Sequence, residues 1–220
     1  MTGRRPNWKM AVDVERCIGC HACSVACKVE HDVPLGMFRT KVYYYDEGRY
    51  PQVKRHFLPT LCMQCEDAPC LKACPTEAIV RGADGIVRII EEKCDGIGLC
   101  ERACPYGAIF AAKDVGAVKC DFCSNRLAHG MQPACVETCP AEVLVFGDAN
   151  DPASPVSLFL ARHGNEVRGL KPEEGTRPAV GYRGHHPEIA QKIPHGRNHV
   201  PESYEMETWA SLDPEPKPHG

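Results

Sequence analysis

The chain has 220 residues, a formal net charge of −3 and 15 cysteines. Acidic and basic residues are nearly balanced, which excludes the basic face on which nucleic-acid-binding proteins depend. No stretch reaches the ~18 consecutive apolar residues that a membrane-spanning helix requires. Only 7% of the residues are aromatic, so we expect bound metal to supply part of the folding free energy.

The start of the chain contains Arg4 and Arg5, a pair that also occurs in twin-arginine leaders. No apolar segment follows the pair before Cys17, so we interpret it as surface charge and expect no targeting signal on this chain. The residues just before Cys17 are expected to form a short apolar strand.

The cysteines fall into four groups, and none lies after Cys139. The groups are Cys17, Cys20, Cys23 and Cys27; Cys62, Cys65, Cys70 and Cys74; Cys94, Cys100 and Cys104; and Cys120, Cys123, Cys135 and Cys139. The first has the spacing C-x2-C-x2-C-x3-C, and each of the other three ends in C-x3-C-P. This pattern is typical of the bacterial ferredoxin run, in which the fourth cysteine ligates the other cluster of a pair.

Short strands are expected between these groups. Residues 42–50, VYYYDEGRY, are predicted to form a strand and turn. Residues 78–89, AIVRGADGIVRI, predict two strands joined by a turn at Asp84-Gly85. The motifs CPTEAI, CPYGAI and CPAEVL are variants of one unit. We therefore expect a module of strand, cluster loop, short helix and strand, present twice.

Glycines and basic residues surround the cysteines. Gly19, Gly96 and Gly98 are placed where backbone N–H groups could approach a thiolate closely. Seven basic residues lie beside cysteine groups: Arg16, Lys28, Lys72, Lys93, Arg102, Lys119 and Arg126. They could stabilise anionic clusters, but we interpret most of them as solvated surface charge.

Three other uses of cysteine compete with iron–sulfur ligation. Disulfide bonds fit poorly because the cysteine count is odd and the C-x2-C-x2-C spacing leaves neighbours too close to pair. Structural zinc needs pairs of C-x2-C, and the fourth group taken alone could form such a site. Residues 17–21, CIGCH, match the haem attachment pattern, but Cys23 and Cys27 complete a cluster run on the same stretch.

The composition changes after Asp148. Residues 149–220 hold 10 of the 19 prolines and no cysteine. One short helix is expected there, with Ser154 as its N-cap, Pro155 in its first turn and Gly164 at its end. The rest is expected to be an extended tail that wraps along a partner subunit, because it is too rich in proline to bury a core of its own.

The four groups together resemble a known family. The segments LPTLCMQCEDAPCLKACP, CDFCSNRLAHGMQPACVETCP and VFGDANDPASPVS are similar to those of the iron–sulfur subunits of the dimethyl sulfoxide reductase group, which accompany molybdopterin oxidoreductases. The resemblance covers about residues 8–180. It implies an α+β fold of two ferredoxin-like modules, with residues 55–112 inserted between the two parts of an outer module, 8–54 and 113–148.

The resemblance also implies four ligand sets. These are Cys17, Cys20, Cys23 and Cys139 for cluster 1; Cys27, Cys120, Cys123 and Cys135 for cluster 2; Cys62, Cys65, Cys70 and Cys104 for cluster 3; and Cys74, Cys94 and Cys100 for cluster 4. The implied cofactors are three [4Fe-4S] clusters and one [3Fe-4S] cluster.

Cluster 4 lacks a fourth thiolate because Ile97 stands where the spacing calls for a cysteine. A cube corner without a thiolate readily loses its iron, so a three-iron cluster is expected there. Asp95 or water are alternative ligands, although Asp95 follows Cys94 directly instead of lying three residues on. One thiolate fewer reduces the negative charge, so the reduction potential is expected to rise.

The implied function is single-electron transfer between a catalytic subunit that contains molybdenum or tungsten and a membrane quinone-reactive subunit or soluble carrier. Sulfur oxyanions are the expected substrate class of the complex. No triad or paired-carboxylate pattern indicates catalysis on this chain. The alternatives are a subunit of a formate dehydrogenase or hydrogenase, and a zinc-stabilised interaction protein. We expect a bacterial membrane-associated complex, on the cytoplasmic side in preference to periplasmic export with a partner.

Overall fold

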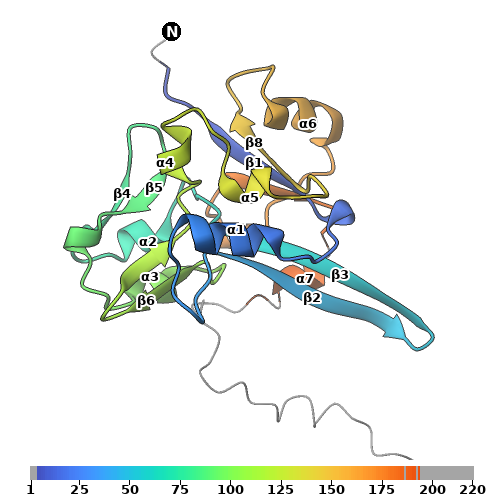
Figure 1. Ribbon diagram of the computed structural model, residues 1–220, viewed down its shortest axis with the longest axis horizontal. Coiled ribbons are helices and arrows are strands. Elements are labelled where there is room, and N and C mark those ends of the chain that lie inside the picture. The colour runs from blue at the N-terminus through green and yellow to red at the C-terminus, as the bar shows by residue number, and fades with distance from the viewer. Residues whose placement is uncertain (1–3, 186, 192, 194–220) are drawn as a thin grey trace, which may run out of the picture.

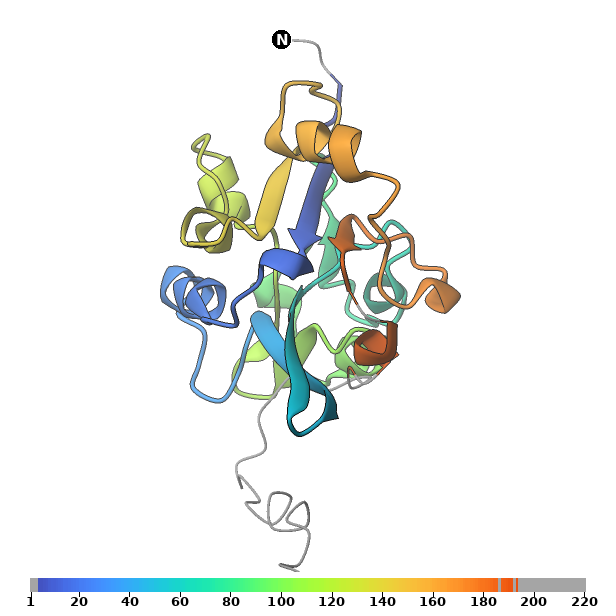
Figure 2. The same cartoon turned by 90° about the vertical axis from the view of Figure 1, so that its right-hand side faces the viewer.

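The computed structural model describes residues 4–185, 187–191 and 193. In this part of the chain, small sheets and short helices surround the cysteine loops (Figures 1 and 2). Ten of the 15 cysteines are buried and form part of the core with the aliphatic and aromatic side chains. The mixed helix and strand character that the sequence predicts is confirmed.

A three-stranded sheet joins distant parts of the chain. Strand β1 (Trp8–Asp13) lies between β8 (Leu144–Asp148), to which it is antiparallel, and β9 (Val180–Arg183), to which it is parallel. The central strand is buried from Met10 to Asp13, so it is covered on both faces. The sheet therefore places the first cysteine group, which follows β1, beside the fourth group, which precedes β8.

The other strands form three antiparallel hairpins. They are β2 (Thr40–Arg49) with β3 (Gln52–Leu61), β4 (Ile79–Arg81) with β5 (Val87–Ile89), and β6 (Ile109–Ala112) with β7 (Gly116–Lys119). The predicted turn at Asp84-Gly85 is confirmed, and Gly85 has the positive φ of 84° that favours glycine. The predicted strand at residues 42–50 is also confirmed, and its hairpin extends from the body of the molecule (Figure 1).

The helices are short. They are α1 (Ala22–Glu30), α2 (Pro69–Lys72), α3 (Leu99–Ala103), α4 (Ser124–Leu127), α5 (Ala134–Glu137), α6 (Pro155–His163) and α7 (Pro187–Gln191). Pro75, Pro105 and Pro140 lie just beyond α2, α3 and α5, and proline cannot continue a helix because it lacks the N–H donor. Within the described residues, none of the helices is long and apolar enough to cross a bilayer.

The predicted helix after Asp148 is confirmed as α6. Ser154 is its N-cap, and the Ser154 hydroxyl accepts a 3.3 Å hydrogen bond from the backbone N–H of Ser157. Gly164 follows the last helical residue. The helix packs against β8 and β1, and Val156 of this helix is fully buried.

The expectation of an extended tail without a core is wrong for much of the segment after Asp148. Leu170, Thr176, Val180 and Tyr182 are all at most 3% exposed. The physical reason is that β9 adds to the free edge of β1, so alternate residues of β9 enter the existing core. Residues 194–220, the remainder of the predicted tail, lie outside the described residues.

The N-cap of α6 gives a stability prediction. Replacing Ser154 with alanine removes the cap and is expected to cost about 1 kcal/mol, which lowers the thermal midpoint by about 2–4 °C in a chain of this size. The matched control is Ser157→Ala, which keeps the backbone N–H that donates to the cap. An equal loss of thermal midpoint in both variants would contradict the capping role.

Candidate metal-cluster sites

Site 1 is a cavity between the start of α1, the β2–β3 hairpin and β8. It is lined by Cys17, Cys20, Cys23 and Cys139, which are the residues predicted for cluster 1. Cys139 comes from a segment more than a hundred residues away in sequence, and the central sheet brings it to the first group. Cys20 is the one exposed cysteine, so site 1 reaches the surface.

Site 2 is the most deeply buried. Burial raises the pKa of the Cys120 and Cys135 thiols far above the usual value, and neighbouring thiols add to the rise. Cys27 is among those neighbours for both, and Cys123 for Cys135. The structure thus brings together the four residues predicted for cluster 2, Cys27 from α1 and the others from the fourth group.

Site 3 lies under the loop that follows β3. Its cavity is lined by Cys62, Cys65, Cys70 and Cys104, together with Val87 and Tyr106. The tyrosine hydroxyl lies 2.6 Å from that of Thr176, so the C-terminal segment helps to close this site. The predicted set for cluster 3 therefore shares one cavity.

Site 4 is a cavity lined by Cys74, Cys94 and Cys100, with Asp95 and Ile97 on the same loop. Ile97 is 44% exposed, so it lies at the mouth of the cavity. The backbone N–H of Ile97 donates to Asp95 Oδ1 at 3.4 Å. This contact turns the Asp95 carboxylate toward its own loop.

Four helices join these sites in pairs. Each carries or ends beside two cysteines that lie four residues apart, about one helical turn. The pairs are Cys23 and Cys27 on α1, Cys70 and Cys74 at α2, Cys100 and Cys104 at α3, and Cys135 and Cys139 at α5. Helix α1 packs against α5, and α2 packs against α3. Sites 1 and 2 therefore share one helix pair, and sites 3 and 4 share the other.

The two pairs of sites meet in the middle of the molecule. Burial is the main cause of the raised pKa of Cys120 in site 2. The Cys62 thiol of site 3 lies close enough to raise the pKa of Cys120 further. The Cys23 thiol of site 1 affects the pKa of Cys135 of site 2 in the same way. Together with the α2–α3 pair that joins sites 3 and 4, these electrostatic effects indicate the order 1, 2, 3 and 4.

The chemistry of the donors fits iron–sulfur clusters. Burial raises the pKa of Cys65 and Cys70 to about 12 and of Cys23 to about 11, so these thiols are neutral near pH 7 unless metal displaces the proton. Backbone N–H groups already point at sulfur: Ala117 N donates to Cys94 Sγ at 3.2 Å, and Val143 N to Cys139 Sγ at 3.3 Å. Such N–H groups favour an anionic sulfur.

A buried polar atom near site 2 also fits an anionic group. The Arg39 Nε atom is buried and has no hydrogen-bond partner among the described residues. Burial raises the pKa of the Cys27 and Cys120 thiols, and the positive charge of the Arg39 guanidinium opposes this rise. A bound anionic cluster would give this Nε–H group an acceptor.

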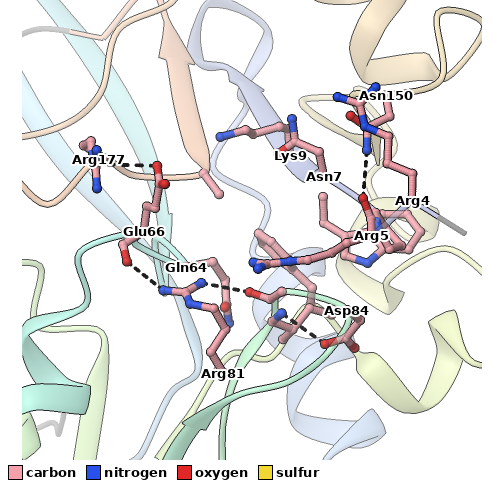
Figure 3. A pocket seen from close by; sticks show the side chains of 16 residues that line it. Arg4, Arg5, Asn7, Lys9, Gln64, Glu66, Arg81, Asp84, Asn150 and Arg177 are labelled. Atoms are coloured by element: carbon pink, nitrogen blue, oxygen red, sulfur yellow. Dashed lines mark hydrogen bonds and ion pairs between the residues drawn. The ribbon is translucent and has the colours of Figure 1, made fainter.

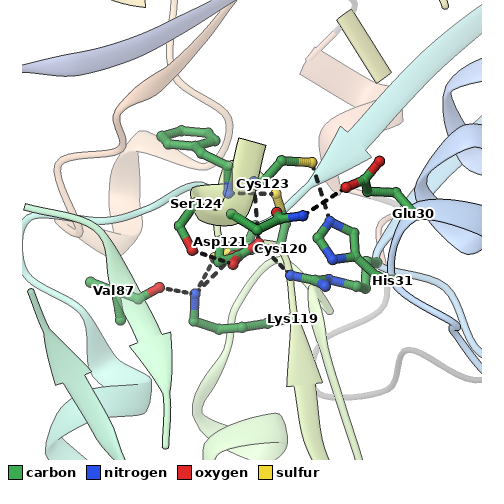
Figure 4. A network of polar contacts seen from close by, with 12 residues as sticks. Glu30, His31, Val87, Lys119, Cys120, Asp121, Cys123 and Ser124 are labelled. Carbon is green, nitrogen blue, oxygen red and sulfur yellow. Dashed lines mark hydrogen bonds and ion pairs between the residues drawn. The ribbon is translucent and has the colours of Figure 1, made fainter. Parts of the chain in front are cut away.

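Sequence reasoning missed a polar network between sites 2 and 3 (Figure 4). Arg39 donates to Asp121 Oδ1 at 2.5 Å, and His31 Nε2 lies 3.2 Å from Cys123 Sγ. Lys119 is only 3% exposed, so its interpretation as surface charge is wrong. That interpretation is correct for Arg16, Lys72, Lys93 and Arg102, which are exposed. The sequence signal was only that Lys119 precedes Cys120.

A cavity of about 540 Å³ lies elsewhere, at the start of β1 (Figure 3). None of the described residues that line it is a cysteine or a histidine. Arg81 extends into it and donates to the backbone carbonyls of Cys65, Glu66 and Gly85. This side chain therefore braces the loop that carries Cys65 of site 3.

Comparisons with known proteins agree with this geometry. A family model described as a 4Fe-4S dicluster domain matches residues 53–149, and one described as a 4Fe-4S binding domain matches residues 8–29. A subunit of tetrathionate reductase from Salmonella typhimurium is 41% identical over 82% of this chain and 73% of its own length. The iron–sulfur subunit of arsenate respiratory reductase from Shewanella sp. is 34% identical over 79% of this chain and 94% of its own.

A third relative is a component of polysulfide reductase from Wolinella succinogenes, 38% identical over 79% of this chain and 92% of its own length. These identities extend over most of both sequences, so the likeness is not confined to the cysteine motifs. The relatives are accessory subunits of reductase complexes. The protein belongs to the family of iron–sulfur electron-transfer subunits of molybdopterin oxidoreductases.

Proposed function

We propose that sites 1 to 3 each hold a [4Fe-4S] cluster and that site 4 holds a [3Fe-4S] cluster. One observation supports this proposal most strongly: the cysteines predicted to hold one cluster lie together in the fold. The last cysteine of each sequence group lies with the cysteines of the adjacent site. When bound, each cluster accepts and releases one electron at a time. The cysteines of this chain hold and space the clusters.

The division into nested modules is part of the same proposal. Residues 8–54 and 113–148 form the outer module, which contains sites 1 and 2, and residues 55–112 form the inserted module, which contains sites 3 and 4. The contacts between α1 and α5 and between α2 and α3 support this division. The central sheet also joins the two halves of the outer module.

The chain relays electrons for a catalytic partner subunit and performs no substrate chemistry itself. We propose a partner that contains molybdenum or tungsten, with sulfur oxyanions as its substrate class, because relatives include tetrathionate and thiosulfate reductase subunits. At the other end of the relay we propose a membrane quinone-reactive subunit or a soluble carrier. We place the complex at the cytoplasmic face of a bacterial membrane.

At site 4, Ile97 leaves one cube corner without a thiolate. The exposed side chain of Ile97 stands at that corner, and the Asp95 carboxylate is engaged by the Ile97 N–H. Neither residue supplies a ligand to a fourth iron. The three-iron state follows from the remaining three cysteines, and its smaller negative charge raises the reduction potential of that end of the relay.

Replacing Ile97 with cysteine tests the assignment of site 4. The oxidised native chain is expected to show an electron paramagnetic resonance signal of about one spin per chain, because oxidised three-iron clusters are paramagnetic and oxidised four-iron clusters are silent. In Ile97→Cys the signal should disappear as a fourth iron binds. The control, Leu99→Cys, adds a thiol to the same cavity at a different spacing and should keep the signal. A native chain that is silent when oxidised contradicts a three-iron site.

The direction of electron flow and the substrate class are tested on the complex of this chain with its catalytic partner. Clusters reduced with limiting dithionite should be reoxidised by tetrathionate or thiosulfate, and the visible absorbance should recover. The chain separated from its partner should show no recovery, because it has no catalytic site. Reduction of the oxidised complex by formate or hydrogen, without recovery on sulfur compounds, would instead identify a formate dehydrogenase or hydrogenase subunit.

A further inference from the structure

The Lys119 side chain is a buried cation between sites 2 and 3. Its Nζ atom donates to the carbonyl of Cys120 at 2.9 Å and to the carbonyl of Val87, and it lies 3.7 Å from Cys62 Sγ. Three acceptors therefore surround the three N–H bonds of one ammonium group. One of these acceptors is the sulfur of Cys62, a site 3 cysteine.

The Lys119 ammonium forms no direct contact with a carboxylate. In the described part of the chain, no ion pair joins Lys119 to an aspartate or a glutamate. Asp121 lies within range of the Lys119 charge, but its ion pair, at 2.5 Å, is with Arg39. Lys119 thus presents its positive charge to the sulfur atoms of site 3.

The cysteines of site 3 respond to this charge. Burial raises the pKa of Cys70 to about 12 and of Cys104 to about 11, and Lys119 is a cation that opposes the rise at both thiols. The effect of the charge therefore extends over the cavity and is not restricted to Cys62. In a buried site the attraction between opposite charges is weakly screened.

We propose that Lys119 is a positioning residue for electron transfer that stabilises the reduced state of the cluster in site 3 and so raises its midpoint potential. The reduced state carries one more negative charge than the oxidised state, and a fixed cation at the cavity wall favours it. This inference rests on the proposed function, because it requires a cluster in site 3. With Lys119 in place, the cluster in site 3 has a higher midpoint potential than it would have with its four cysteine ligands alone.

The structure offers a neutral counterpart to Lys119. The Gln64 side chain donates to the same two carbonyls, Val87 O at 3.1 Å and Cys120 O at 2.8 Å. Both carbonyls therefore keep a donor when Lys119 is replaced, which favours folding of the variants. Gln64→Met removes hydrogen bonds from the same place without changing the charge, so it separates the charge of Lys119 from its structural contacts.

The test is a potentiometric titration of the full-length chain with its copurifying partners, followed by electron paramagnetic resonance. In Lys119→Met and Lys119→Gln, the equilibrium constant for reducing one four-iron cluster should fall at least tenfold, a shift of about 59 mV for one electron. Gln64→Met and the exposed control Lys54→Met should leave every midpoint within threefold of the native equilibrium constant.

The outcomes separate this inference from the proposed function. Full cluster content with unchanged midpoints in both Lys119 variants would overturn the role of Lys119 and leave the relay intact. An equal shift in Gln64→Met, or loss of the cluster from both Lys119 variants, would make Lys119 a structural residue and also overturn it. A native chain without iron–sulfur signals would contradict the proposed function itself.

Discussion

The constraint on which the rest of the structure depends is the distance of one helical turn between paired cysteines. Helix α1 presents Cys23 and Cys27 one turn apart, and the structure places Cys23 in site 1 and Cys27 beside the thiols of site 2. Each cysteine pair therefore bridges two sites. Four helices with this spacing are enough to arrange the sites in one line, and the connecting hairpins only have to bring the helices together in pairs.

This arrangement also explains why the core is built around cysteine. Ten buried thiols occupy positions that aliphatic side chains fill in other proteins of this size. Burial raises the pKa of Cys23, Cys65, Cys70 and Cys104 among them, so these four thiols stay protonated until metal binds, and metal binding is coupled to proton release and to folding. Cations near the sites, Lys119 and Arg39, reduce the electrostatic cost of placing anionic clusters next to one another. The stability of the fold and the electron relay thus both depend on cluster binding.

Much of this architecture was predictable from local sequence patterns. The family resemblance carried by the cysteine groups anticipated which residues share a cavity, and turn residues such as Gly85 and the cap Ser154 marked the hairpin and the helix. Ligation itself, the nested modules and the three-iron state of site 4 stay predictions. Two features required contacts between distant segments. Strand β9 joins β1 across about 170 residues in a proline-rich segment, and the buried Lys119 ammonium donates to the carbonyl of Val87, which lies on a separate hairpin.

The central claim is that this one chain carries four clusters, of which one lacks an iron. The most direct measurement is the content of iron and acid-labile sulfide in the full-length chain purified without oxygen. Three four-iron clusters and one three-iron cluster require about 15 iron atoms and about 16 sulfide ions per chain. Zinc in place of iron, with no sulfide, would contradict the iron–sulfur relay, and about 16 iron atoms would contradict the three-iron site.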